Sequence, residues 1–267
     1  MSSNYQRVKL HYQSLLSEHY TWMFGDSTLT YKSNLQILSQ FLPKAKDGFN
    51  LAIDLGCGTG FQTIPLLQLD YNVIAIDSSP QLIDELQIVA KSRNLIDKLN
   101  TIEGDLVNFP TLKDEVTPDS PNVIICMGDT LTHLDSLETI EGLFRKTFST
   151  LHENGIFLLQ FRDLSRPLVD TDRFIPIRSD ERTVFTCFLE WENNATEEDG
   201  TGCTIKVNDL IHVKKGIGAW ELCTSWYHKL AVSQSWCLNL LKSIGFHIVE
   251  SDNNNGMIFI FASKREQ

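Results

Sequence analysis

The 267-residue chain lacks the marks of several broad protein classes. It has no apolar run long enough to span a bilayer and no charged-then-apolar leader, so we expect neither membrane insertion nor secretion. Its formal net charge of −11 is the opposite of the basic excess typical of nucleic-acid-binding proteins. Its six cysteines form no C-x-x-C pair and show no Cys/His ligand spacing, so no metal site is expected. These absences favour a cytoplasmic protein with a small-molecule partner, and neither nucleic acid nor membrane as a partner.

Two phosphate-binding motifs are also missing from the most informative loop. The run that begins at Leu51 reads LAIDLGCGTG: an apolar strand carries Asp54 near its end, and three glycines follow at alternate positions. A dinucleotide-binding G-x-G-x-x-G would need a glycine where Phe61 stands, and no G-K-[S/T] follows the loop. Such glycines allow a tight strand-to-helix turn and let a ligand approach the backbone. An acid here would repel a pyrophosphate, but it suits a nucleoside-like ligand that carries an ammonium group.

Two further predicted strands end in acids. Asp77 lies about 20 residues after the glycine loop, where folds of this kind place a carboxylate on ribose hydroxyls. Asp77 is also a candidate helix N-cap, since Ser78-Ser79-Pro80 follows, and the two roles are compatible. Asp105 ends the third strand; taken alone it would be an ordinary surface acid.

Strands and helices alternate along most of the chain. Strands are predicted at 51–60, 71–77, 101–106, 122–134 and 155–163, the first and fourth with their exit loops, and helices at 80–94 and 134–151. A helix over Ser233–Gly245 and a hairpin of Phe246–Ser251 with Met257–Ser263 follow. This rhythm predicts an α/β fold with a doubly wound, mostly parallel seven-stranded sheet, which is Rossmann-like.

Residues 181–232 break the rhythm. Three runs rich in β-formers, Glu181–Trp191, Thr204–Lys215 and Ala219–Val232, are separated by turn signals, which predicts an antiparallel three-stranded insertion. The second run places Ile205, Val207, Ile211 and Val213 on one face, and the third groups Leu222, Trp226 and Leu230. We expect this insertion to form a lid or wall over the substrate pocket at the carboxyl edge of the parallel sheet. The alternative is an edge extension or a homodimer surface.

The D-x-G-x-G-x-G pattern that starts at Asp54 resembles the first motif of class I S-adenosylmethionine-dependent methyltransferases. This resemblance implies S-adenosylmethionine as cofactor, with Asp105 on the adenine amino group and the backbone amide of Leu106 beside it. An acceptor-only carboxylate suits such an exocyclic amine. The cofactor residues that the resemblance implies along the three strand ends are Asp54, Gly56, Cys57, Gly58, Asp77, Ser78, Asp105 and Leu106.

Shorter segments resemble the glycine N-methyltransferase subgroup. The loop CMGDTLTHL (126–134) is similar to that family's C-L-G-N-S-F-A-H-L loop, and Phe161-Arg162-Asp163 is similar to its H-R-N. By position, Met127, Gly128 and His133 would contact the cofactor, and Arg162 would bind an acidic acceptor through its planar fork. Asp129 stands where the family has an amide. The alternatives are structural: an ion pair of Arg162 with Asp163, and a single helix-terminal hydrogen bond for His133.

The amino-terminal segment Tyr5–Phe24 has helical spacing, and its last residues through Asp26 resemble the same family's aromatic–Gly–Asp segment. Tyr20 and Trp22 are placed to close over the methionine end of the cofactor by a cation–π contact, although packing would explain the same aromatic stripe. The expected organisation is one domain over 1–267. It divides into cap helices (1–48), a cofactor-binding core (49–164), the inserted lid (165–232) and a closing helix with hairpin (233–267).

The predicted activity is methyl transfer to a small-molecule acceptor, an amine or amino-acid-like compound. Asp129 or His133 would accept the acceptor's proton or orient it. Three alternatives remain open: methylation of oxygen, carbon or arsenic on the same fold, a non-catalytic S-adenosylmethionine-binding protein, and a dinucleotide oxidoreductase.

Overall fold

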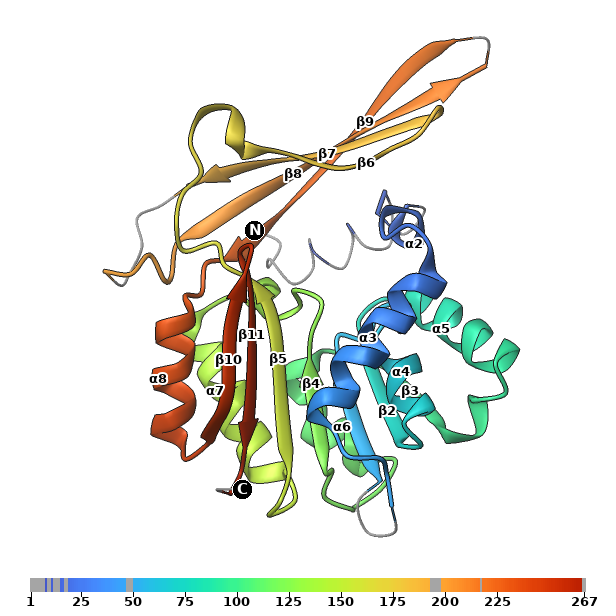
Figure 1. Ribbon diagram of the computed structural model, residues 1–267. Helices are drawn as coiled ribbons and strands as arrows, with labels where there is room; N and C mark the ends of the chain where they lie inside the picture. Colours follow the sequence, from blue (N-terminus) through green and yellow to red (C-terminus); the bar gives the residue numbers. More distant parts are fainter. Residues whose placement is uncertain are drawn as a thin grey trace. The chain divides into compact units, whose positions relative to one another are not determined.

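The computed structural model describes residues 8, 11, 15–16, 19–46, 50–192, 198–216 and 218–265 (Figure 1). Contacts within the chain divide it into two compact units. The larger unit comprises Asp26–Leu131, Leu137–Arg162 and Gln234–Gln267, and the smaller comprises Met1–Gly25, Thr132–Ser136 and Asp163–Ser233. Each unit contains one sheet.

The larger unit is built on a seven-stranded sheet in the order β10-β11-β5-β4-β1-β2-β3 (Figure 1). Its strands are β1 (Leu51–Leu55), β2 (Asn72–Asp77), β3 (Leu99–Glu103), β4 (Val123–Cys126), β5 (Ile156–Arg162), β10 (His247–Asn254) and β11 (Met257–Ser263). Strands β1 to β5 pair in parallel, whereas β11 runs antiparallel to both of its neighbours. The predicted mostly parallel, doubly wound sheet is confirmed.

The helices of this unit carry side-chain caps at two of their amino-terminal ends. They are α3 (Ser27–Phe41), α4 (Thr63–Gln68), α5 (Pro80–Ser92), α6 (Phe109–Asp114), α7 (Leu137–Thr150) and α8 (Gln234–Ile244), with short 3₁₀ turns η1 (Ile96–Lys98) and η2 (Leu106–Asn108). Asp26 caps α3 by accepting from the Thr28 N–H at 2.8 Å. Ser79 caps α5, whose first residue is Pro80. None of the helices described is long and apolar enough to cross a membrane.

The central strands carry the core of the larger unit. All four residues of β4 are buried, and so are Ala52, Ile53 and Leu55 of β1, as expected for parallel strands covered on both faces. From β1 the chain builds outward to β2 and β3, and then returns to place β4 on the other side of β1. Ligands of open α/β sheets bind at the carboxyl ends of the strands where the order reverses. The candidate site is therefore sought at the exits of β1 and β4.

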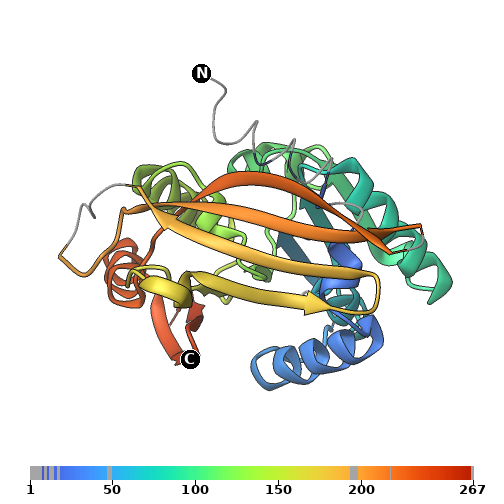
Figure 2. The ribbon, with the colours of Figure 1, turned by 90° about the horizontal axis from the view of Figure 1, so that it is seen from above.

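The smaller unit is built on an antiparallel sheet of four strands in the order β6-β7-β8-β9 (Figure 2). They are β6 (Phe174–Ser179), β7 (Thr183–Trp191), β8 (Thr204–Lys215) and β9 (Ala219–Leu230); the unit also holds α2 (Tyr20–Met23) and η4 (Asp170–Arg173). The expected number of three strands missed β6. This edge strand contains Pro176, next to a register shift, and proline is typical of edges and bulges rather than of strand interiors.

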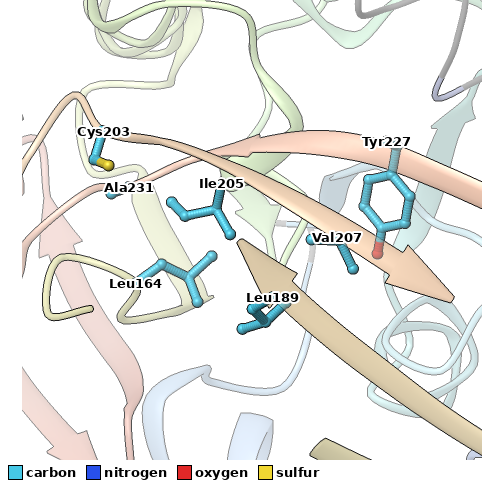
Figure 3. Packing of buried hydrophobic residues seen from close by; sticks show 7 residues of the cluster. All are labelled: Leu164, Leu189, Cys203, Ile205, Val207, Tyr227 and Ala231. Carbon is cyan, nitrogen blue, oxygen red and sulfur yellow. The ribbon is translucent and has the colours of Figure 1, made fainter. Parts of the chain in front are cut away.

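One face of the smaller sheet is buried, and Figure 3 shows its main apolar cluster. Val207 of β8 pairs with Leu189 on one side and with Tyr227 on the other, and all three are buried. Leu222 and Trp226 alternate with these positions and lie on the opposite face of β9, where Leu222 is 51% exposed. Residues two positions apart in a strand share a face, so the sequence shows which side chains lie together. It does not show which face is buried when both faces of the sheet carry apolar residues.

Most of the predicted helix over Tyr5–Phe24 lies outside the described residues; within it the structure describes α2. His133 ends the 3₁₀ turn η3 (Leu131–His133) rather than beginning a helix, and α7 starts four residues later.

Candidate active site

The glycine loop is a tight turn that is fastened to the neighbouring strand. The backbone N–H groups of Gly56 and Cys57 both donate to the Ile76 carbonyl, at 2.8 and 3.1 Å. Gly56 has φ +79°, and a Cβ there would lie 2.3 Å from Thr130 Cγ2. Thr130 in turn donates its hydroxyl to the Met127 carbonyl at 3.1 Å. The loops that leave β1 and β4 are therefore in contact at the point where the strand order reverses.

Asp77 connects this loop to the start of α5. Its Oδ2 accepts from the Gly58 N–H at 2.8 Å, and its Oδ1 accepts from the Ser79 N–H at 2.9 Å. Burial raises the pKa of Asp77, and these backbone donors act in the opposite direction. The helix N-cap is Ser79 and not Asp77, which corrects one reading of the sequence. Asp77 instead holds a carboxylate in a fixed orientation beside the glycine loop.

Asp54 is the most deeply buried acid of the site, at 1% exposure. The Thr63 hydroxyl donates to its Oδ2 at 2.6 Å. The pKa of Asp54 is raised to about 7, chiefly by burial and in part by the Asp77 carboxylate, while the Thr63 hydrogen bond acts in the opposite direction. A cationic ligand group placed next to Asp54 would lower that pKa again. A buried acid of this kind fits an ammonium-bearing ligand and is unsuited to a phosphate.

The third strand end brings a further carboxylate to the same edge. The Gly104 N–H donates to the Asp77 carbonyl at 2.9 Å, which fastens the end of β3 to that of β2. Asp105 follows directly, and its Oδ1 accepts from the Val107 N–H at 3.0 Å, so that it caps η2, whose first residue is Leu106. The exits of β1, β2 and β3 thus present Asp54, Asp77 and Asp105 along one edge of the sheet.

The exit of β4 is an unusual stretch of backbone. Met127 is buried, and Gly128 and Asp129 have φ of +73° and +72°. The Asp129 N–H donates to the Gln160 carbonyl at 3.2 Å, and Asp129 Oδ1 accepts from the Arg162 N–H at 2.9 Å. The Asp129 side chain therefore braces the last residue of β5, which carries the candidate acceptor-binding guanidinium.

Ser78 lies with Asp77 in the larger unit, whereas the predicted site residues His133, Tyr20 and Trp22 belong to the smaller unit. The His133 ring stacks on Tyr227 with centroids 5.2 Å apart. Trp22 donates its Nε1–H to Asp180 at 2.8 Å, and Tyr20 lies edge-on to Phe24 at 5.2 Å. Both α2 aromatics pack against the apolar cluster of Leu16, Phe185 and Ile211. In this structure these aromatics make packing contacts.

The sequence analysis missed a polar cluster on the buried face of the smaller sheet. His11 lies within hydrogen-bond distance of Ser225 and within ion-pair distance of Asp209. A signal for this cluster was present, because Asp209 interrupts the alternating apolar face of β8 between Val207 and Ile211. In the described part of the chain, no group of three or more His, Cys, Asp or Glu side chains is arranged to hold a metal ion.

The central part of the chain resembles known methyltransferases. Residues 52–155 match a family model described as a methyltransferase domain. A glycine/sarcosine N-methyltransferase of Parasynechococcus marenigrum (strain WH8102) is 25% identical over 160 residues, which are 59% of this chain and 54% of that protein. The chain thus spans about half of this relative's length.

Solved structures share the fold over nearly the whole chain. The CcbJ methyltransferase from Streptomyces caelestis has a TM-score of 0.73 at 14% identity and covers 94% of this chain and 96% of its own. CalS10, an amino pentose methyltransferase from Micromonospora echinaspora, has a TM-score of 0.69 at 11% identity and covers 94% and 97%. Residues 52–155 therefore match a methyltransferase domain, and the chain shares the fold of these methyltransferase structures.

Proposed function

We propose that this protein transfers the methyl group of S-adenosylmethionine to a small-molecule amine. The observation that carries the proposal is the edge formed by Asp54, Asp77 and Asp105 around a glycine turn. Such an edge offers carboxylates to an ammonium group, to ribose hydroxyls and to an exocyclic amine, and it holds no cation for a phosphate. When bound, S-adenosylmethionine supplies an electrophilic methyl group.

The chain's own residues would hold that cofactor as follows. Asp77 would accept from the ribose hydroxyls, because its carboxylate is already oriented by two backbone N–H groups. Asp105 and the Leu106 amide would bind the adenine edge, and Asp54 would face the ammonium group. The other residues of the larger unit proposed to line the cofactor are Gly56, Cys57, Gly58, Ser78, Met127 and Gly128.

The acceptor would be bound at the exits of β4 and β5. Arg162 offers a planar cation suited to a carboxylate on the acceptor, and Asp129 fixes the backbone from which Arg162 projects. Asp129 would also orient the acceptor amine. An amine acceptor is supported by two similar proteins, a glycine/sarcosine N-methyltransferase and an amino pentose methyltransferase.

A direct assay tests this proposal. Purified protein is incubated with S-adenosylmethionine carrying a labelled methyl group and, separately, with glycine, sarcosine and an amino sugar, and the labelled product is identified by mass spectrometry. Label on nitrogen is the expected result. Label on oxygen or carbon would overturn the amine assignment. Cofactor binding without transfer to any amine would favour a non-catalytic binding protein. Arg162→Lys serves as a matched variant, and we expect it to raise the KM of acidic acceptors above all.

A further inference from the structure

The side chain of Gln62 lies where the loops that leave β1 and β4 meet. Gln62 follows Gly60, the last glycine of the turn, by two positions and is the residue directly before α4. A Cβ built on Gly128, in the loop after β4, would lie 3.7 Å from Gln62 Nε2 and 4.0 Å from its Oε1. All three residues belong to the larger unit. The carboxamide of Gln62 is therefore part of the edge at which the strand order reverses.

This carboxamide is half-buried and makes no hydrogen bond to the residues that the structure describes. The backbone on either side of it is nevertheless held in place. Asn34 of α3 donates its Nδ2–H to the Phe61 carbonyl at 2.9 Å, and the Thr63 hydroxyl donates to the buried Asp54 at 2.6 Å. An amide side chain offers two N–H donors and one acceptor oxygen. Gln62 thus presents unused donors from a fixed position next to Thr63 and Asp54.

The charges of this edge leave one part of the proposed ligand without a partner. An acid stands near the end of each strand from β1 to β4, and these acids are Asp54, Asp77, Asp105 and Asp129. An adenosyl amino acid carries an ammonium group and a carboxylate on the same carbon atom. The acids suit the ammonium group, whereas the carboxylate requires hydrogen-bond donors, which ionised acids do not provide. In the proposed function Arg162 is occupied by the acceptor.

A neutral amide supplies such a donor at a smaller electrostatic cost than a cation would. A lysine or arginine beside Asp54 would compete with the ligand's ammonium group for that carboxylate. An amide N–H leaves Asp54 to the ammonium group, and a hydrogen bond to an ionised acceptor is roughly twice as strong as one between neutral groups. Gly128 leaves the space beside the amide open, since even a Cβ at this position would contact it.

We propose that Gln62 donates its Nε2–H to the carboxylate of the cofactor's amino-acid end, and thereby selects adenosyl compounds that retain this carboxylate; this inference rests on the proposed function. Asp54 and Gln62 then divide the two charged groups of one carbon atom between them. The acid takes the ammonium group, and the amide takes the carboxylate. Thr63, which follows Gln62 in the chain and donates to Asp54, keeps the two side chains next to each other.

A pair of ligands isolates this contact. Decarboxylated S-adenosylmethionine keeps the adenosine, the sulfonium and the amino group and lacks only the carboxylate. Isothermal titration calorimetry gives the dissociation constants of S-adenosylmethionine and of this analogue for the wild type and for Gln62→Ala. We expect Gln62→Ala to bind S-adenosylmethionine about tenfold or more weakly, the scale of a lost hydrogen bond to a charged group. The affinity of the variant for the decarboxylated analogue should stay within about twofold of the wild type, which also shows that the variant is folded.

A second variant reverses the sign of the interaction at nearly constant size. Gln62→Glu places a carboxylate against the ligand's carboxylate, so it should weaken S-adenosylmethionine more than Gln62→Ala does. The same variant should bind the decarboxylated analogue at least as well as the wild type, because that ligand carries only positive charge at this end. Gln68→Ala is the matched control: Gln68 is the exposed last residue of α4, and its loss should leave both dissociation constants unchanged.

Two results would overturn the role of Gln62 and leave the proposed function intact. If Gln62→Ala weakens both ligands equally, Gln62 supports the loop and does not bind the carboxylate. If Gln62→Ala binds S-adenosylmethionine with unchanged affinity and instead raises the KM of the amine, the carboxamide faces the acceptor. The proposed function itself fails, and this inference with it, if the wild type binds neither S-adenosylmethionine nor its decarboxylated analogue.

Discussion

The Asp129 carboxylate accepts a hydrogen bond of 2.9 Å from the backbone N–H of Arg162. The contact joins the loop after β4 to the last residue of β5, across 33 positions of sequence. Asp129 achieves it from a left-handed backbone conformation, with φ +72°. The bond fixes the base of the side chain that we propose binds the acceptor's carboxylate.

Replacement of Asp129 by alanine should therefore cost stability. Asp129→Ala removes the acceptor of the Arg162 N–H and puts alanine in a left-handed conformation that aspartate tolerates better, so we expect a loss of about 2 kcal/mol in the free energy of unfolding. Asp129→Asn keeps an acceptor oxygen and suits the left-handed region, so it should stay within about 0.5 kcal/mol of the wild type. Urea denaturation measures both. Equal losses in the two variants would contradict the assigned hydrogen bond.

Asp54 should make stability depend on pH. Its folded pKa is raised from 3.8 to about 7, so the folded protein favours the protonated acid. That contribution is complete below the unfolded pKa and is lost as pH rises through about 7. Asp54→Asn cannot ionise and should gain up to about 4 kcal/mol relative to the wild type between pH 4 and pH 8.

Thermal unfolding at several pH values checks this expectation. Asp84→Asn, which removes an exposed carboxylate of α5, is the control for net charge. The account of Asp54 would be contradicted by an Asp54→Asn curve that runs parallel to that of the wild type over this range.

Two glycines at the exits of β1 and β4 allow a matched comparison. Gly56 and Gly128 have similar positive φ, +79° and +73°, so an alanine at either position meets similar backbone strain. A Cβ at Gly56 would lie 2.3 Å from Thr130 Cγ2, whereas at Gly128 the nearest atom is Gln62 Nε2 at 3.7 Å. Gly56→Ala should therefore lose about 1–3 kcal/mol more stability than Gly128→Ala, the cost of overpacking. Similar losses would show that the two loops do not touch as described.

Asp77 should control cofactor affinity through its orientation. Asp77→Ala removes both the proposed ribose acceptor and the brace on the Gly58 N–H, and we expect S-adenosylhomocysteine to bind at least about tenfold more weakly, by roughly 1.4 kcal/mol or more. Asp77→Asn retains an oxygen for one backbone donor, so its affinity for S-adenosylhomocysteine should lie between those of the wild type and Asp77→Ala. Fluorescence or calorimetric titration gives the dissociation constants. Unchanged affinity in Asp77→Ala would remove this residue from the site.

Local patterns predicted the larger unit well because its strands and turns are determined by neighbours in sequence. Alternating glycines, acids at strand ends and βα rhythm place the strands from β1 to β5, and the hairpin turn at Asn255-Gly256 has the positive φ that its residues favour. The sequence did not predict β6 of the smaller sheet, because this strand is short, contains Pro176 and gains its partners only through pairing with β7.

The polar cluster of His11, Asp209 and Ser225 shows what sequence patterns do not reveal. His11 and Ser225 are 214 positions apart, and no local rule brings them together. Asp209 did leave a trace, as a charged residue in an otherwise apolar alternation, but its partners come from other strands and from the amino-terminal segment. Likewise, the sequence offered Asp129 as a possible proton acceptor, and only the structure revealed its hydrogen bond to Arg162.

The central claim is that the edge formed by Asp54, Asp77 and Asp105 binds an adenosyl amino acid. Isothermal titration of the purified protein with S-adenosylmethionine, S-adenosylhomocysteine and NADH, each alone, tests it most directly. The account predicts saturable one-to-one binding of the first two ligands, with proton release near pH 7 as the ammonium group lowers the pKa of Asp54, and no heat with NADH. Binding of NADH, or no heat with either adenosyl compound, would contradict it.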